Sequence, residues 1–245
     1  MFAVLFVLAC WEGVARWLDS PLLVPSPVDV WNSAVVLTQN GELFHNACAS
    51  VSRLMLALLV GIPLGVILGC SMGRWPVVDA MLAPFVGMFN SIPAIALIPF
   101  SLLWLGVSEL SRFSLLLYTI ALTVLLSARQ GVRSVPSLRL KAGATLGVTG
   151  IPAFFRVIIP SCIPAIVVGI RTAIGLGVMV VVAAEMLGAN SGLGYMIMQA
   201  RSQFNVSDMA VAVMSLGFLS LLLDRLFQGT IKRFLPRWSV RRRIR

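Results

Sequence analysis

Two ionisable residues, Arg171 and Glu185, lie inside long apolar stretches of this sequence. A charge at the centre of a membrane-spanning helix costs about 2.5–3.5 kcal/mol, so such residues usually have a function or a route to water. Glu185 directly precedes the turn GANSGLG, where it either belongs to a solute path or gate or binds a backbone amide or Arg201. Arg171 either extends its side chain to water or faces an anion.

A third candidate site interrupts the apolar stretch at residues 81–105. Asn90, Ser91 and Pro93 occur there, in the sequence FNSIPAIALIPF. Proline removes one backbone hydrogen bond, which leaves a carbonyl oxygen able to line a cavity and bind a small polar solute. The alternative is a simple kink, relieved by the neighbouring serine and asparagine side chains.

The sequence lacks the patterns typical of metal, thiol or nucleotide chemistry. Its four cysteines form no CxxC pair, and its single histidine has no cysteine partner near it. These residues are Cys10, Cys48, Cys70, Cys162 and His45. A phosphate-binding loop needs GxxxxGK(S/T), and neither lysine, Lys141 or Lys232, has that setting. We expect no catalytic residue, no metal, no cofactor and no phosphate-binding loop of this kind in the chain.

Composition predicts an all-α integral membrane protein. Of the 245 residues, 59% are apolar and 11% are charged, and the mean hydropathy is +0.97. Soluble domains average about 45–50% apolar and about 25% charged residues. Because a membrane helix needs roughly 20 apolar residues, we expect one membrane domain over 1–245 with about six spans, and an interfacial helix that begins near Ser26-Pro27. The expected spans are 2–18, 51–72, 81–105, 113–127, 163–187 and 209–227.

The net charge of +10 indicates membrane topology, not nucleic-acid binding. The loop after the fourth span and the tail, about 230–245, carry cations and no acids. The cations are Arg129, Arg133, Arg139, Lys141 and Arg156 in the loop, and Lys232, Arg233, Arg237, Arg241, Arg242, Arg243 and Arg245 in the tail. The positive-inside rule therefore places this loop and both termini in the cytoplasm, with the tail at anionic lipid head groups.

The cytoplasmic loop itself, about 131–160, has the signals of two short helices. Pro136 permits a helix start, and Leu138, Ala142 and Leu146 recur on one face before Gly147 supplies a stop. A second helix would be capped by Thr149 and ended by Pro160. The resulting glycine elbow is either a docking surface for a partner or an ordinary solvated loop.

The spacing from Lys141-Ala142-Gly143 through Gly147 to Ile159-Pro160 resembles the EAA loop of bacterial ABC-importer permeases. Other segments are similar to the branch that imports nitrate, taurine and other sulfonates, or thiamine precursors. They are PSPVDVW (25–31), Ser52-Arg53, SIPAIALIPFSLLWLGVSELSR (91–112) and AEMLGANSGLGYMI (184–197). Lys141 departs from the motif by replacing its glutamate, and Gly143 by replacing its second alanine at a cost of about 1 kcal/mol in helix propensity.

The resemblance implies a type I ABC-importer permease of the bacterial inner membrane, which carries a small anionic solute inward by alternating access. Its loop would be a coupling helix that docks on an ATPase through the motif positions. These are Leu138, Lys141, Ala142, Gly143, Leu146, Gly147 and Pro160. The implied partners are two cytoplasmic ABC ATPase subunits, a periplasmic or lipid-anchored solute-binding protein, and a second permease copy. The chain itself would not be an enzyme.

Two other classes remain open from the residues alone. An ATP-independent secondary transporter or pore would need inverted repeats with broken helices in both halves, whereas a proline-interrupted span occurs in one half only. A membrane-bound assembly or signalling component would transport nothing. Association with an ATPase separates these classes.

Overall fold

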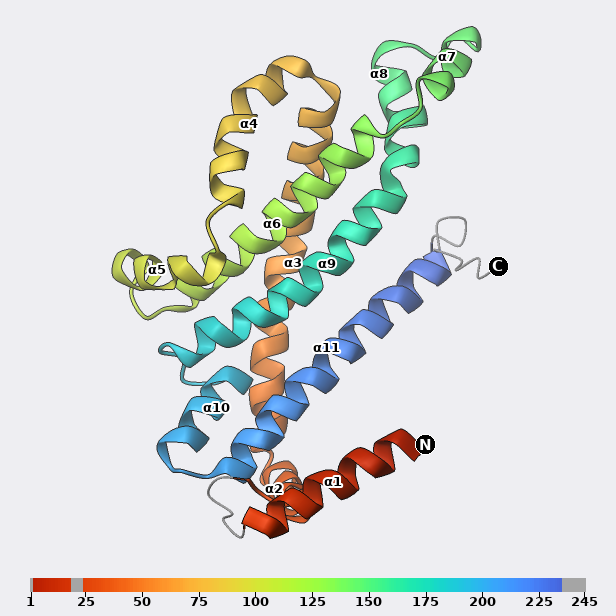
Figure 1. Cartoon of the computed structure of the whole chain (residues 1–245). Coiled ribbons are helices and arrows are strands. Elements are labelled where there is room, and N and C mark those ends of the chain that lie inside the picture. Colours follow the sequence, from red (N-terminus) through yellow and green to blue (C-terminus); the bar gives the residue numbers. More distant parts are fainter. Residues whose placement is uncertain (1, 19–23, 235–245) are drawn as a thin grey trace. The chain divides into compact units, whose positions relative to one another are not determined.

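The computed structural model describes residues 2–18 and 24–234, and within them every regular element is helical (Figure 1). The elements are α1 (Phe2–Leu18), α2 (Pro27–Gln39), α3 (Glu42–Arg74), α4 (Pro76–Asn90), the 3₁₀ turn η1 (Ala94–Leu97), α5 (Ile98–Leu105), α6 (Glu109–Arg133), α7 (Ser137–Thr145), α8 (Gly150–Ala153), the π-helical turn η2 (Phe154–Ile158), α9 (Ile159–Met186), α10 (Leu193–Ser202) and α11 (Val206–Phe234). The end of the basic tail, 235–245, lies outside the described residues.

The chain divides into two compact units. The first comprises residues up to 53 together with 181–220, and the second comprises 54–180 together with the residues from 221 onward. The helices α3, α9 and α11 contribute residues to both units. A single permease domain over the whole chain stays a prediction.

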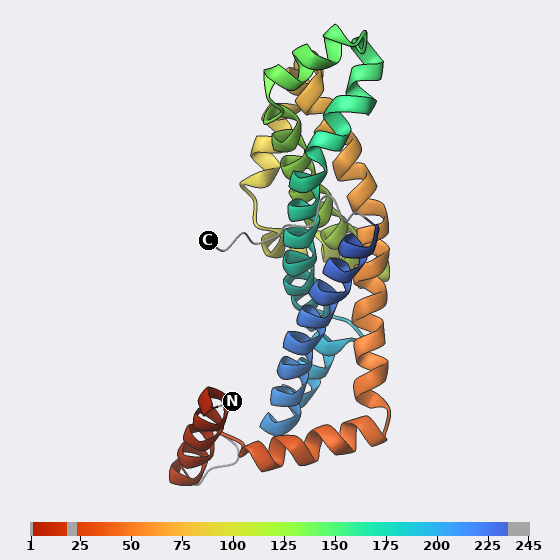
Figure 2. The same ribbon diagram turned by 90° about the vertical axis from the view of Figure 1, so that its right-hand side faces the viewer.

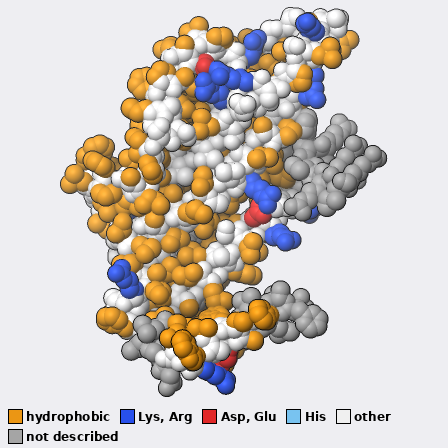
Figure 3. All heavy atoms as spheres, viewed as in Figure 1, with side chains coloured by type: hydrophobic (Ala, Val, Ile, Leu, Met, Phe, Trp, Pro, Cys, Tyr) orange, Lys and Arg blue, Asp and Glu red, His pale blue; other side chains and the backbone are white. Residues whose placement is uncertain are grey.

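Four described helices are long and apolar enough to cross a membrane, and a bent pair adds a fifth candidate. The four are α3, α6, the continuous run Gly150–Met186, and Val206–Arg233 of α11. The expected third span, 81–105, is not straight: it consists of α4 and the segment Ala94–Leu105, bent by 86°. The expected first span corresponds to α1, whose 17 residues are at the lower limit for crossing a hydrocarbon core. Apolar side chains cover much of the surface near α4 and α5 (Figure 3).

In the second unit, α3 and α6 pack closely because glycines recur every four residues on one face of α3 (Figures 1 and 2). A Cβ atom on Gly61 would lie 2.8 Å from a methyl carbon of Ile120, and one on Gly65 would lie 2.6 Å from the Ala121 carbonyl oxygen. Small-residue faces of this kind let helix backbones approach closely in membranes.

In the first unit, α2, α10 and α11 enclose an apolar core that includes Val30, Leu37, Leu193, Met196 and Val211. The start of α2 agrees with the sequence prediction. Ser26 and Asp29 form a reciprocal capping box, and Pro27 occupies the first turn. Its exposed surface carries both apolar residues, among them Trp31 at 70% exposed, and polar ones such as Asn32. The interfacial position of this helix stays a prediction.

Gly65→Ala should destabilise the protein by about 1–3 kcal/mol, because the added methyl group must push α3 away from α6. Thermal unfolding of the detergent-purified protein, followed by loss of the monodisperse chromatographic peak, measures the effect. Gly87→Ala is the matched control: its Cβ has no neighbour within 4 Å, and it should be neutral or stabilising by up to about 1 kcal/mol. Equal melting temperatures for both variants would contradict the close packing.

Candidate functional site

The first helix predicted in the cytoplasmic loop is α7, and it ends as the sequence predicted. Gly147 adopts a left-handed backbone with φ of +78°. Its N–H donates to the Ala144 carbonyl at 3.0 Å, and the Val148 N–H donates to the Gly143 carbonyl at 2.9 Å. This pair of bonds is a Schellman motif, which satisfies the last carbonyl groups of a helix and reverses the chain.

The predicted contact face of α7 is open to solvent. Leu138 and Leu146 are 75% and 82% exposed, and Lys141 and Ala142 are exposed beside them. After the turn, the apolar surface continues through Ile151 and Phe155, which are 70% and 64% exposed. We call Leu138, Ala142, Leu146, Ile151 and Phe155 the loop surface; α7 and α8, which carry most of it, are labelled in Figure 1.

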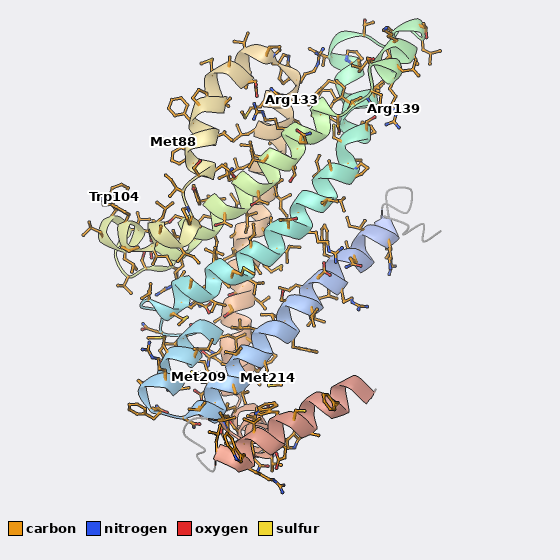
Figure 4. The ribbon with its side chains drawn as sticks, viewed as in Figure 1. Met88, Trp104, Arg133, Arg139, Met209 and Met214 are labelled. Carbon is orange, nitrogen blue, oxygen red and sulfur yellow. The ribbon has the colours of Figure 1, made fainter. Side chains whose placement is uncertain are left out.

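The opposite side of α7 rests on the chain that follows it. Gly143 is buried, and a Cβ there would lie 3.3 Å from a methyl carbon of Val157. The glycine that replaces the motif alanine therefore brings α7 closer to η2 than an alanine would. Arg139 adds a second link, because its Nη1 donates to the Ser161 hydroxyl at 3.2 Å; Arg139 is labelled in Figure 4.

The second predicted helix begins where it was predicted to begin, but it does not end at Pro160. Thr149 occupies the N-cap position, but its side chain accepts no capping hydrogen bond. Pro160 does not end the helix: it lies in the first turn of α9, which continues to Met186. The reason is the π-helical turn before it, where the Ile159 N–H donates to the Phe154 carbonyl, five residues earlier. This turn shifts the hydrogen-bond register of the helix, so the helix continues although Pro160 has no N–H to donate.

An ion-pair cluster connects the start of α4 to the end of α6. Asp79 accepts from Arg129 Nε at 2.6 Å and also from Arg133, labelled in Figure 4. Nearby, the ring of Trp75 packs on that of Phe154 in η2, with centroids 5.4 Å apart. Two of the cations that indicate topology thus have a carboxylate partner, which the sequence pattern did not predict.

At the break between α4 and η1, the hydroxyl group of Tyr118 on α6 lies within hydrogen-bond distance of two carbonyl oxygens. The Tyr118 hydroxyl lies 2.5 Å from the Phe89 carbonyl oxygen and 3.0 Å from that of Ile92. The predicted residues Asn90, Ser91 and Pro93 are exposed at this break. The Ser91 hydroxyl donates to the Gly87 carbonyl at 3.0 Å, so the kink is relieved partly by serine, as the alternative reading held, and partly by Tyr118, which was missed.

Glu185 is completely buried and forms the centre of a polar cluster. Its carboxylate accepts from Arg53 Nη1 at 2.7 Å, from the Ser50 hydroxyl at 2.8 Å, and from the Gly194 N–H at 3.0 Å. The expected backbone-amide partner is present. The charged partner, however, is Arg53 and not Arg201, because α3 presents Arg53 next to Glu185.

The same cluster fixes the loop 188–194. Asn46, Ser50 and Arg53 follow the i, i+4, i+7 spacing of one helix face. Asn46 Oδ1 accepts from the Gly192 N–H at 2.8 Å, Ser50 Oγ accepts from the Leu193 N–H at 2.9 Å, and Arg53 donates to the Ser191 carbonyl at 2.7 Å. A Cβ on Gly192 would collide with the Glu185 carboxylate. We call Asn46, Ser50, Arg53 and Glu185 the loop clamp.

Arg171 forms a bidentate ion pair with α11. Its Nε and Nη2 lie 2.6 and 2.8 Å from the two carboxylate oxygens of Asp224, and Gln228 donates to the same carboxylate at 2.7 Å. The Arg171 side chain is 56% exposed and that of Asp224 is 27% exposed. No three His, Cys, Asp or Glu side chains come together as a metal site within the described residues.

Glu185→Gln should loosen the loop 188–194, because it removes the negative charge opposite the nearly buried Arg53. Breaking a buried ion pair costs about 3–5 kcal/mol, so the amides of 192–194 should exchange hydrogen roughly two to four orders of magnitude faster. Peptide-resolved hydrogen exchange measures this, and solute uptake should change with it. Glu12→Gln is the control, because Glu12 pairs with an Arg16 that is 78% exposed and should cost under about 1 kcal/mol. Unchanged exchange at 192–194 would contradict the role of the clamp.

Comparison with known proteins agrees with this geometry. Residues 61–240 match the family described as "Binding-protein-dependent transport system inner membrane component". A probable ABC transporter permease of Brucella abortus is 34% identical over 233 residues, which cover 94% of this chain and 93% of the relative. The taurine transport system permease protein TauC of Escherichia coli is 31% identical, over 92% of this chain and 84% of that protein.

Further relatives and a solved structure extend the likeness. A putative aliphatic sulfonates transport permease of Escherichia coli is 31% identical over 95% of this chain and 89% of its own length. The fold matches a chain of the MetNI methionine ABC transporter with a TM-score of 0.54 at 17% identity, over 77% of this chain and 94% of that one. The fold is therefore the expected type I ABC-importer permease fold. This chain belongs to the family of inner membrane components of binding-protein-dependent transport systems, and it is the permease subunit of an ABC importer.

Proposed function

We propose that this permease is driven by two cytoplasmic ABC ATPase subunits that dock on the loop surface. A solute-binding protein, periplasmic or lipid-anchored, delivers a small anionic solute, and a second copy of the chain completes the path. Both termini are cytoplasmic, and ATP hydrolysis takes place on the partner subunits. The family description, which names a binding-protein-dependent system and its inner membrane component, supports this assignment.

The observation that carries the proposal is the exposed loop surface itself. Leu138, Leu146, Ile151 and Phe155 are all more than 60% exposed, although the cations around them predict a loop in the aqueous cytoplasm. Contiguous exposed apolar side chains rimmed by polar ones are typical of a protein interface. Lys141 is exposed beside this surface where the related motif has a glutamate, so we expect an acidic group opposite it on the ATPase.

Force applied at the loop surface has a short route into the membrane. Gly143 rests on Val157, and Arg139 donates to Ser161. The chain from Gly150 to Met186 is one continuous helical run, so a displacement of α7 is passed directly to a membrane-spanning helix. Pro160 lies within this run and, with the π-helical turn, gives it a point of bending.

The proposed solute path includes Asn90, Ser91, Pro93 and Arg171, whose side chains are exposed in the structure. Glu185 affects transport through the loop 188–194 that it holds, because its own side chain is fully buried. The anionic solute is supported by the names of two relatives, which specify taurine and aliphatic sulfonates. A third relative, from Halalkalibacterium halodurans, is named for formylaminopyrimidine.

No observation favours an ATP-independent transporter or pore, since that function would leave the loop surface without an occupant. The deciding experiment is purification of the chain from its native membrane with the associated proteins identified. We expect an ABC ATPase to co-purify and reconstituted vesicles to take up solute only with ATP and the binding protein. A purified chain that binds no ATPase and gives no ATP-dependent uptake would refute the proposed function.

Gly147→Asp should leave membrane insertion intact and lower binding-protein-stimulated ATP hydrolysis at least tenfold. The side chain would enter open space on the loop surface, with no atom of this chain within 4 Å of its Cβ, and would place a charge in the docked interface. Gly41→Asp is the matched control, because Gly41 has a similar φ of +74° and equally open surroundings. Stimulated hydrolysis that survives Gly147→Asp, or falls equally in both variants, would contradict docking at this elbow.

A further inference from the structure

The exposed faces of the membrane-spanning helices in the second unit differ sharply in polarity. On α3, the segment 54–70 contains no polar or charged residue except Cys70, which is buried, and its exposed side chains are all apolar. By contrast, α9 and α11 expose Arg171, Thr172 and Arg225, with the partly exposed Asp224 and Gln228 beside them. The α3 face is therefore suited to lipid, and the face of α9 and α11 is not.

Because Arg171 and Asp224 are both charged, the surface of α9 and α11 that carries them cannot lie in lipid. An ionisable side chain within a membrane-spanning segment almost always faces a protein interior or a water-filled cavity. More than half of the Arg171 side chain is open, however, so this chain does not itself enclose it. Water or another protein must contact this face.

The bonding of the pair leaves room for a further ligand. An arginine guanidinium has five N–H donors arranged to match carboxylates and similar anions. Arg171 uses Nε and Nη2 on Asp224, while its Nη1 donates to no described residue. Asp224 also accepts a hydrogen bond from Gln228 at 2.7 Å, and Arg225 is the next residue in the sequence. Asp224 would therefore remain solvated and partnered if Arg171 turned away.

We propose that the surface around Arg171, Thr172 and Asp224 borders the aqueous solute path, and that Arg171 binds the anionic group of the solute in place of Asp224. This inference rests on the proposed function and names the recognising group: a guanidinium that binds a sulfonate or carboxylate. Asp224 is its resting counter-ion. An ion pair in contact with water is weak, so a passing anion can displace the aspartate, and the aspartate displaces the anion again when the solute leaves.

The test uses small charged thiol reagents, so that the natural solute need not be known. Val168→Cys places a thiol one turn before Arg171, at a position that is 54% exposed, in full-length protein whose exposed Cys10 and Cys48 are replaced by serine. Membrane vesicles are treated with a methanethiosulfonate that carries a sulfonate group and, separately, with one that carries a quaternary ammonium group. The ratio of the two reaction rates reports the local charge.

We expect the cysteine at 168 to react with both reagents. The sulfonate-to-ammonium rate ratio should depend on the charges of Arg171 and Asp224. Arg171→Gln should lower this ratio by roughly tenfold and Asp224→Asn should raise it by roughly tenfold, because each removes one unit charge a few ångströms from the thiol in water. The double variant, which removes both charges, should restore the ratio. Arg225→Gln is the matched control for losing an exposed arginine nearby and should change the ratio less than Arg171→Gln. Leu59→Cys, 73% exposed on α3, should not react because it faces lipid.

Two outcomes would overturn the inference. A cysteine at 168 that reacts no faster than one at 59 places this face in lipid or under a second copy. A ratio that is indifferent to both Arg171→Gln and Asp224→Asn removes the pair from anion recognition. Thr172→Cys provides a second reporter position if the Val168→Cys protein is not recovered. Because the reagents need no ATPase, these results stand apart from co-purification, which decides the proposed function.

Discussion

The structure depends on one constraint: inside a hydrocarbon core, each backbone N–H and carbonyl group must find its partner within the protein. Continuous helices satisfy this requirement by themselves, so the informative places are those where a helix stops or changes register. Among the described residues, we consider three such places: the bend after α4, the loop 188–194 and the turn before Pro160. At the bend, the single Tyr118 O–H is shared between the carbonyl oxygens of Phe89 and Ile92. At the loop, Asn46, Ser50 and Glu185 accept from three backbone N–H groups. Before Pro160, a π-helical turn absorbs the missing donor.

Local features were predictable from sequence because their causes are local. The capping box of α2, the glycine stop of α7 and the small-residue face of α3 each follow from residues within one or two turns. The pairing of Glu185 with Arg53 spans 132 positions, and nothing in the spacing distinguishes Arg53 from Arg201 as a partner. The misplaced helix end at Pro160 has a related cause, since a π-helical turn has no sequence signal comparable to a proline.

The two groups of buried or paired charges serve different mechanical purposes. The loop clamp is closed to solvent and holds backbone amides, which makes the loop 188–194 rigid relative to α3. The Arg171–Asp224 pair is half open, and the loop surface is open altogether. The buried charges that hold a loop and the exposed residues expected to bind partners therefore lie in different segments of the chain. Where solute or partner subunits are expected to bind, side chains are exposed, and where a loop must keep its shape, they are buried.

The loop clamp recognises main-chain atoms, and this bears on how the sequence can drift. Its bonds to Gly192, Leu193 and Gly194 go to three successive backbone N–H groups and not to side chains. Replacement of the exposed Asn190 would leave every one of these bonds in place, whereas deleting or inserting a single residue would move all three amides out of register at once. Loop length, more than loop composition, is thus the property that selection should preserve here, and a segment of equal length with glycines at the same two places is the natural unit for exchange between permeases.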